Sequence, residues 1–156
     1  MREIHLTRGK VAIVDDADYE WLSAFKWYCS ADGYAGRTWS QWEDGRVVRR
    51  WTEQMHVIIM GKRPGMQIDH ANGNTLDNRR SNLRHATLSQ NRANRRRRKE
   101  FSSKYKGVHR HGDRWTSTIC LNGEHFHLGR FKTQEEAAAV YAKAAREKFG
   151  DFACAG

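Results

Sequence analysis

A carboxylate, an imidazole and an amide stand close together in one polar stretch of this sequence. Residues 66–94 read MQIDHANGNTLDNRRSNLRHATLSQNRAN and hold the adjacent pair Asp69 and His70, followed by Asn91. A carboxylate and an amide carbonyl are oxygen ligands of the kind that Mg²⁺ binds, and together they leave positions for phosphate and water. An imidazole that titrates near neutral pH can take a proton from an attacking water. These residue types predict metal-dependent hydrolysis of a phosphodiester.

Local signals predict the elements that would position these three side chains. Residues 66–69 form a short strand that ends at the Asp-His pair, and 72–81 are rich in Asn, Gly and Asp, as in a loop. Residues 83–87 form a second short strand. Thr87 and Gln90 then make a T-x-x-Q capping box, which places the start of a helix just before the amide. The order of strand, loop, strand and helix predicts a compact ββα unit.

The pieces DHANGN, LDNRRSNLR and SQN make this segment similar to the HNH endonuclease motif, most closely in its phage- and intron-encoded homing branch. The resemblance covers about 40 residues. It implies a small ββα-metal (His-Me finger) nuclease unit in which Asp69 binds the metal and His70 is the general base. It further implies that Asn82 steadies the loop and the histidine, and that Asn91 is the second metal ligand.

The third position of the motif is His in many family members and Asn in the homing branch. Asn91 therefore differs from the last letter of the name HNH but agrees with this branch. His85 is an alternative for that third position. It falls in the second predicted strand, where a structural or phosphate-facing role suits it better.

Basic residues are concentrated in one part of the chain. The formal net charge is +10, and residues 79–110 hold twelve Arg or Lys with a single acid, Glu100. A block of this kind indicates binding to a polyanion, because each Lys or Arg that neutralises a phosphate releases a counterion. The alternative is a solvated basic tail. We expect contacts to DNA, mainly to its backbone, from Arg79, Arg80, Arg84, Arg92, Arg95, Arg96, Arg97 and Arg98.

Residues 103–152 predict a separate sheet-plus-helix module. Residues 115–121 and 124–128 alternate in polarity and are joined by Asn122-Gly123, a strong hairpin signal. Thr133 and Glu136 make a capping box that opens an Ala-rich helix ending at Phe149-Gly150. YKGV, HLGRF and the following T-x-E-E-A-A pattern resemble the DNA-binding domain of the plant Apetala-two and ethylene-response-factor proteins. The resemblance implies a three-stranded sheet that lies in the major groove.

One face of that sheet should pack on the helix, through Val108, Trp115, Ser117, Ile119, Leu121, Phe126 and Leu128. The open face and its border should contact DNA through Lys106, His109, Arg110, Arg114, Thr116, Thr118 and Arg130. His109, Thr118 and Cys120 stand where the plant domain has charged readers, so its target sequence cannot be carried over. His109, Cys120, His125 and His127 lack a close ligand pair, so no structural zinc is expected.

Residues 1–60 indicate a mixed α+β segment with no catalytic constellation. The patterns predict a strand at 11–14, a helix at 17–25 after Asp15-Asp16, strands at 26–30, 34–38 and 47–52, and a helix at 53–60. We expect the tryptophans of this segment to pack in a core rather than stack on bases; they include Trp21, Trp27, Trp39, Trp42 and Trp51.

Together these signals predict an α+β protein with segments 1–60, 61–100 and 103–152. No apolar run approaches the roughly 20 residues that span a bilayer, and the first residues lack a secretion signal. Cys29, Cys120 and Cys154 show no disulfide pattern. We expect a cytoplasmic, phage- or mobile-element-encoded enzyme of a bacterial cell that cuts double-stranded DNA as a monomer.

The expected activity is that of a site-directed, homing-type endonuclease that uses Mg²⁺ or another divalent metal. A monomer with one active site favours nicking of one strand. The alternative is a non-catalytic, regulatory DNA-binding protein in which the HNH unit is a scaffold. RNA binding is a third possibility for which the sequence shows no recognised module.

Overall fold

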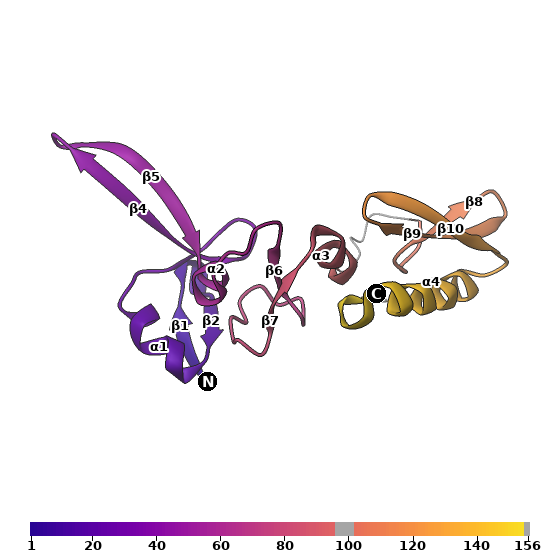
Figure 1. The fold of residues 1–156 in the computed structure, drawn as a ribbon, viewed down its shortest axis with the longest axis horizontal. Coiled ribbons are helices and arrows are strands. Elements are labelled where there is room, and N and C mark those ends of the chain that lie inside the picture. Colours follow the sequence, from indigo (N-terminus) through magenta and orange to yellow (C-terminus); the bar gives the residue numbers. More distant parts are fainter. Residues whose placement is uncertain (96–101, 155–156) are drawn as a thin grey trace. The chain divides into compact units, whose positions relative to one another are not determined.

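A computed structural model describes residues 1–95 and 102–154 of the chain. The chain divides into two compact units, Met1–His85 and Ala86–Gly156. Each unit combines helices with antiparallel strands (Figure 1), so the predicted α+β class is confirmed. No helix within the described residues is both long and apolar enough to cross a membrane.

The first unit holds three small sheets, two α-helices and one short 3-10 helix. Its strands pair in the orders β1-β2, β3-β4-β5 and β6-β7. In chain order its elements are β1 (Arg2–His5), η1 (Thr7–Gly9), β2 (Val11–Val14), α1 (Asp16–Ser23), β3 (Tyr28–Cys29), β4 (Ala35–Glu43), β5 (Arg46–Gln54), α2 (Met55–Met60), β6 (Gln67–His70) and β7 (Leu83–Ala86).

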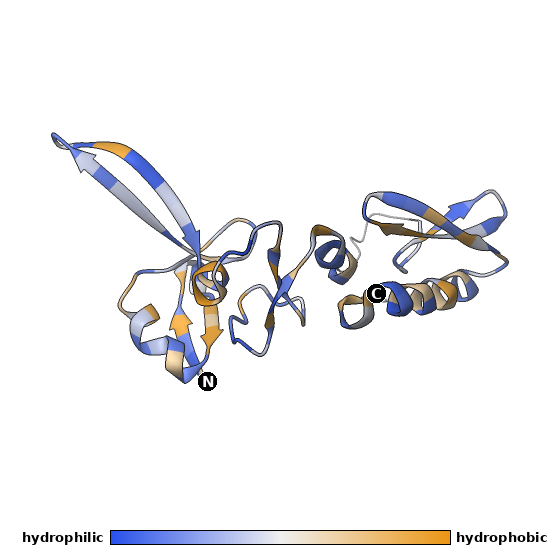
Figure 2. Cartoon of the chain, in the orientation of Figure 1, coloured by the Kyte–Doolittle hydropathy of each residue, from blue (hydrophilic) through white to orange (hydrophobic). Residues whose placement is uncertain are grey.

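The core of this unit joins the N-terminal segment to the strands that carry the motif. Leu22 of α1, Met55 of α2 and Leu83 of β7 belong to the same buried cluster. In Figure 2 the hydrophobic residues of this unit gather on β1, β2 and α2. The backbone of Ile13 reinforces the connection: its N–H donates to the Leu76 carbonyl at 2.8 Å and its carbonyl accepts from Asn78 N–H at 2.8 Å. The loop between β6 and β7 is therefore fastened to strand β2.

The β4–β5 hairpin extends away from the rest of the first unit (Figure 1), and its strands are longer than predicted. Asp44 and Gly45 join them with φ angles of 47° and 75°, the left-handed conformations that a tight hairpin turn requires. This extension determines which tryptophans of the segment are buried and which are exposed. Only Trp27, 5% exposed, confirms the predicted core role. The predicted core role is wrong for four exposed tryptophans: Trp21, Trp39, Trp42 and Trp51. The hairpin that carries three of them extends beyond the core, and α1, which carries Trp21, is covered on one face only.

The second unit is a three-stranded antiparallel sheet with helices. The strand order is β10-β9-β8, and Asn122 and Gly123 form the predicted hairpin turn with φ angles of 51° and 94°. The capping boxes predicted at Thr87 and Thr133 are both present. The elements are α3 (Leu88–Asn94), β8 (Val108–His111), β9 (Arg114–Leu121), β10 (Glu124–Phe131), α4 (Gln134–Phe149) and η2 (Gly150–Phe152).

Two side chains of this sheet differ from the prediction in their solvent exposure. Thr116, expected on the open face, is buried. It lies on the central strand between His109 and Arg130, whose longer side chains flank it in the register. Phe126, expected to face the helix, is 45% exposed on the edge strand β10, next to a register shift between His127 and Gly129. The register keeps both residues on the predicted faces, because Thr116 pairs with the open-face His109 and Phe126 pairs with the helix-facing Ile119. Their exposure alone differs from the expectation, and the DNA contact predicted for Thr116 stays a prediction.

Candidate active site

Asp69 and His70 end strand β6, and both side chains are buried, at 6% and 4% exposure. Backbone hydrogen bonds hold the turn that follows. Gly73 N–H donates to the His70 carbonyl at 2.8 Å, and Ala71 N–H donates to the Asn82 carbonyl at 2.9 Å. The strand end is thereby fixed against the start of β7.

The side chain of Asn82 ties together the loop between the two strands. Its Oδ1 accepts from the Asn72 N–H at 3.0 Å, and its Nδ2 donates to the Asp77 carbonyl at 2.7 Å. Asn72 Nδ2 in turn donates to a carboxylate oxygen of Asp77 at 2.8 Å. Asn82 is buried, so both polar ends of its amide are satisfied within the loop. This amide fixes the shape of the loop that follows the Asp-His pair.

Arg84 on β7 forms an ion pair with Asp69 on β6. Its Nε and Nη2 each lie 2.9 Å from Asp69 Oδ2. The carboxylate is 6% exposed and the guanidinium side chain 21% exposed, so water screens the pair only weakly. Arg84 therefore balances the charge of the predicted metal ligand, and its predicted contact with DNA stays a prediction.

His70 belongs to a cluster of three rings. The centroid of the His56 ring lies 5.0 Å from that of His70 in an edge-to-face arrangement. Tyr34 lies 5.2 Å from His56 and 5.9 Å from His70. Burial lowers the pKa of His70, opposed by an interaction with Asn78 and by nearby carboxylates. A lowered pKa favours the neutral imidazole, the form that accepts a proton.

Sequence reasoning missed His56 and Tyr34. His56 is the second residue of the short helix α2, whose neighbours Met55 and Ile59 are buried. The sequence signal that could have indicated a buried His56 is its position between two apolar residues of a predicted helix. It did not say which residue the ring would meet, because α2 and β6 come together only through tertiary packing.

Arg79 and Arg80 have carboxylate partners inside the first unit. Arg79 binds both oxygens of Asp77, at 2.7 and 2.6 Å. Arg80 binds both oxygens of the buried Asp18 on α1, at 2.8 Å each, and its N–H donates to Asp15. Both arginines therefore brace the loop, and their predicted contacts with DNA stay predictions.

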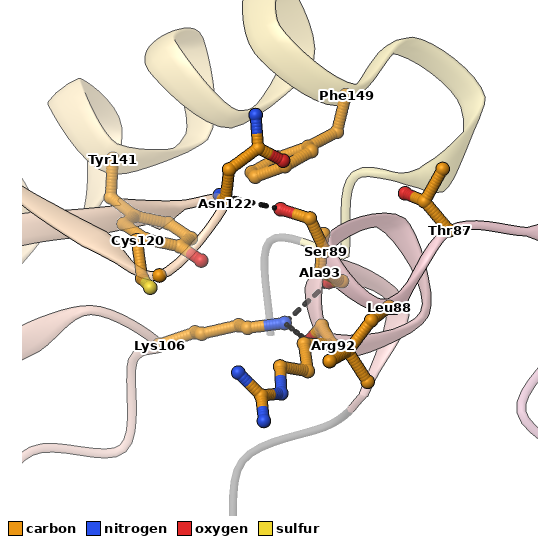
Figure 3. Close-up of a pocket in the computed structure, with 11 residues that line it drawn as sticks. Thr87, Leu88, Ser89, Arg92, Ala93, Lys106, Cys120, Asn122, Tyr141 and Phe149 are labelled. Carbon is orange, nitrogen blue, oxygen red and sulfur yellow. Dashed lines mark hydrogen bonds between the residues drawn. The ribbon is translucent and has the colours of Figure 1, made fainter. Parts of the chain in front are cut away.

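Asn91 lies in α3, in the second unit, where its N–H donates to the Thr87 carbonyl at 2.9 Å. This helix is packed on the C-terminal module. Lys106 Nζ donates to the carbonyl oxygens of Arg92 at 3.0 Å and Arg95 at 2.7 Å, and also to that of Ala93, beside a cavity of about 460 Å³ (Figure 3). Lys106, predicted to contact DNA, thus stabilises the end of α3, where carbonyl groups lack helical partners.

The other residues predicted to bind DNA are distributed over the second unit. Thr118 is half-buried on β9. Arg96, Arg97 and Arg98 lie outside the described residues. The exposed ones are Arg92, Arg95, His109, Arg110, Arg114 and Arg130.

The predicted donor set fits a hard divalent cation. Asp69 supplies a carboxylate oxygen and Asn91 an amide oxygen, the ligand types that Mg²⁺ and Ca²⁺ prefer. Within residues 1–95 and 102–154, no three His, Cys, Asp or Glu side chains are grouped to hold a metal. Asp69 belongs to the first unit and Asn91 to the second, and their joint role as metal ligands stays a prediction.

The site thus consists of a buried Asp-His pair at a strand end, followed by a loop that an asparagine braces. The HNH endonuclease family matches residues 55–93. The chain is also 33% identical over 153 residues to an uncharacterized HNH endonuclease of Acanthamoeba polyphaga mimivirus, covering 94% of this chain and 74% of that protein. The chain belongs to the HNH endonuclease family, and its enzymatic class is that of DNA-cleaving nucleases.

Proposed function

We propose that this endonuclease is a site-directed, homing-type enzyme that hydrolyses a DNA phosphodiester at Asp69, His70 and Asn91. The observation that best supports this is the buried Asp69–His70 pair, held at the end of β6 by a loop that Asn82 braces. Asp69 and Asn91 would hold Mg²⁺ or another divalent cation. Such a cation, when bound, stabilises charge on the phosphate and on the departing 3′ oxygen.

His70 acts as the general base. Its neutral imidazole takes a proton from water as the water oxygen bonds to phosphorus, and the bond from phosphorus to the 3′ oxygen breaks. The departing 3′ oxygen keeps the electron pair and takes a proton from solvent water. The products are 5′-phosphate and 3′-hydroxyl ends. Asn82 acts on this step through the loop, because it keeps the turn after His70 in one shape.

The C-terminal module serves as the DNA reader. Its three-stranded sheet and exposed arginines support an Apetala-two-like mode in which strands lie in the major groove. The basic block at 79–110 supplies backbone affinity. The target is a long, loosely read duplex site, and a monomer nicks one strand of it. The setting we infer is a phage or mobile element in the bacterial cytoplasm.

The test is conversion of supercoiled plasmid with Mg²⁺ by wild type, His70→Ala and the control His5→Ala, which changes an exposed histidine of the same unit. Loss of the base should lower the rate by about 10²- to 10⁴-fold, while His5→Ala cuts like wild type. Equal conversion by His70→Ala refutes the assigned base. Binding without cleavage under several divalent metals would support the non-catalytic alternative.

A further inference from the structure

The outer part of the β4–β5 hairpin, residues 38–52, is here called the ribbon. Every residue from 41 to 52 is exposed, so neither face of the ribbon has a cover within the first unit. Two-stranded ribbons are at best marginally stable when isolated in water. Figure 1 shows the ribbon projecting from the rest of the first unit, so packing in the core of that unit does not account for its length.

The ribbon exposes large apolar side chains. Trp42 is 63% exposed, Val48 51%, Trp51 43%, Trp39 38% and Val47 37%. Figure 2 shows a hydrophobic band on β5 between hydrophilic stretches. Single exposed apolar residues are common on protein surfaces, but a group of them on one projecting element marks an interaction surface.

The charge of the ribbon specifies the kind of partner. Strand β5 carries the exposed Arg46, Arg49 and Arg50, and among the described residues none of the three forms an ion pair. The acids Glu43 and Asp44 are confined to the end of β4 and the turn. Behind the turn the ribbon is therefore cationic as well as aromatic, a combination that favours a polyanion with apolar surfaces of its own.

The register distributes the arginines over both faces. Trp39 lies opposite Trp51 and Gln41 opposite Arg49, so these side chains share one face. The Arg49 guanidinium lies 5.8 Å from the Trp51 ring centroid. Arg50 lies opposite Ser40 and points to the other face. Guanidinium groups on both faces suit a groove that has a phosphate backbone on each side.

We propose that the ribbon is a second DNA-contacting arm of this enzyme and lies in the major groove of the duplex that it cuts. This inference rests on the proposed function for the choice of ligand. The major groove admits a two-stranded ribbon. A nine-residue strand is about 30 Å long, close to one turn of B-DNA. Arg49 and Arg50 contact phosphates, and the tryptophan pair packs on sugar and base edges.

The test compares two full-length triple variants that lose equal charge. Arg46→Gln/Arg49→Gln/Arg50→Gln removes the arginines of the ribbon. Lys143→Gln/Arg146→Gln/Lys148→Gln removes three exposed cations from α4. Binding to duplex DNA is measured in EDTA over a salt series, after circular dichroism has shown both variants folded.

The ribbon variant should bind at least tenfold more weakly, and its log–log salt slope should fall by about 2 to 3, since each lost phosphate contact removes about 0.9. Hydroxyl-radical footprinting should show one protected segment lost from the wild-type footprint. The α4 variant should keep both the slope and the footprint. Trp51→Ala, which removes one ring of the tryptophan pair and no charge, should weaken binding several-fold with the salt slope unchanged.

Equal affinity, slope and footprint for the ribbon variant and the α4 variant would overturn the proposal. So would light scattering that shows the ribbon variant losing self-association while its DNA affinity is unchanged, because the surface would then serve a second copy of the chain. The binding assay contains no metal, so its result is independent of cleavage. A wild type that binds through the ribbon without cutting would refute the proposed catalysis and leave the arm established.

Discussion

The ring of His56 meets the ring of His70 edge-on, with 5.0 Å between their centroids. Both side chains are buried, and among the described residues nothing hydrogen-bonds Nδ1 of His56. Burial, with a smaller contribution from His70, lowers the pKa of His56 to about 4. Burial thus lowers the pKa of both rings, and a charge on His70 would further disfavour protonation of His56.

The stability of the first unit should therefore depend on pH through His56. In the unfolded chain His56 titrates near its ordinary pKa of 6.5, and in the folded chain near 4. Between these values the unfolded state binds the extra proton, so the free energy of unfolding falls as pH drops through this window, by up to about 3 kcal/mol. Urea unfolding at a series of pH values measures the fall. His56→Gln should lose this part of the pH dependence, whereas the exposed control His5→Gln keeps it; parallel curves for wild type and His56→Gln would contradict the prediction.

The ion pair of Arg84 with Asp69 predicts a metal-dependent rescue of stability. Arg84→Met leaves the buried Asp69 carboxylate without this cation, which should destabilise the metal-free protein by about 3 kcal/mol. A divalent cation that binds Asp69 would then restore much of the loss, because binding to the folded state alone stabilises it.

Thermal unfolding in EDTA and in excess Mg²⁺ checks this. Arg79→Met is the matched control, because its partner Asp77 is equally buried but is not a predicted ligand. Mg²⁺ should raise the melting temperature of Arg84→Met more than that of Arg79→Met. An equal response of the two variants would remove Asp69 from the metal site.

The pair of Arg80 with Asp18 should behave as a structural clamp. Arg80→Ala leaves Asp18, 4% exposed, without its guanidinium, and should cost about 1–2 kcal/mol, less than a fully buried pair because Arg80 is 55% exposed. Glu20→Gln breaks an exposed pair on the same helix and should cost at most about 0.5 kcal/mol. Denaturant unfolding gives both values. If Arg80→Ala weakened DNA binding without changing stability, Arg80 would be a DNA contact instead.

The sequence predicted those parts of the fold that depend on neighbouring residues. The hairpin turn at Asn122-Gly123 and the two capping boxes are set by a few adjacent side chains and their backbone preferences, and all three are present. The strands and helix around Asp69 were predicted for the same reason, to within a residue or so of their observed bounds.

Features that depend on distant residues were missed. The contact of Asp18 with Arg80 joins positions 62 residues apart, and no local pattern connects them. His56 meets His70 only because α2 packs beside β6. The exposed Trp39 and Trp51 show the same limit, since alternation along a strand does not say whether anything covers its apolar side chains.

Gly107 should tolerate no side chain. Its φ is +68°, and a Cβ there would lie 2.2 Å from the ring of Tyr141 and 2.5 Å from the carbonyl oxygen of Thr118. Thr118 N–H also donates to the Gly107 carbonyl at 2.8 Å, so the backbone cannot simply move away. Gly107→Ala should cost about 3 kcal/mol or more, from backbone strain and overpacking together.

A substitution at Gly112 separates the cost of backbone strain from the cost of overpacking. Its φ is +63°, but a Cβ there would meet nothing within 4 Å. Gly112→Ala should therefore carry only the backbone strain, about 1 kcal/mol. Amide hydrogen exchange at the buried Ile119 of β9 reports the stability of the second unit by itself. The exchange should accelerate far more in Gly107→Ala than in Gly112→Ala. If both variants accelerated it equally, Tyr141 would not pack against the Gly107 backbone as described, and the cost at both glycines would come from their dihedral angles alone.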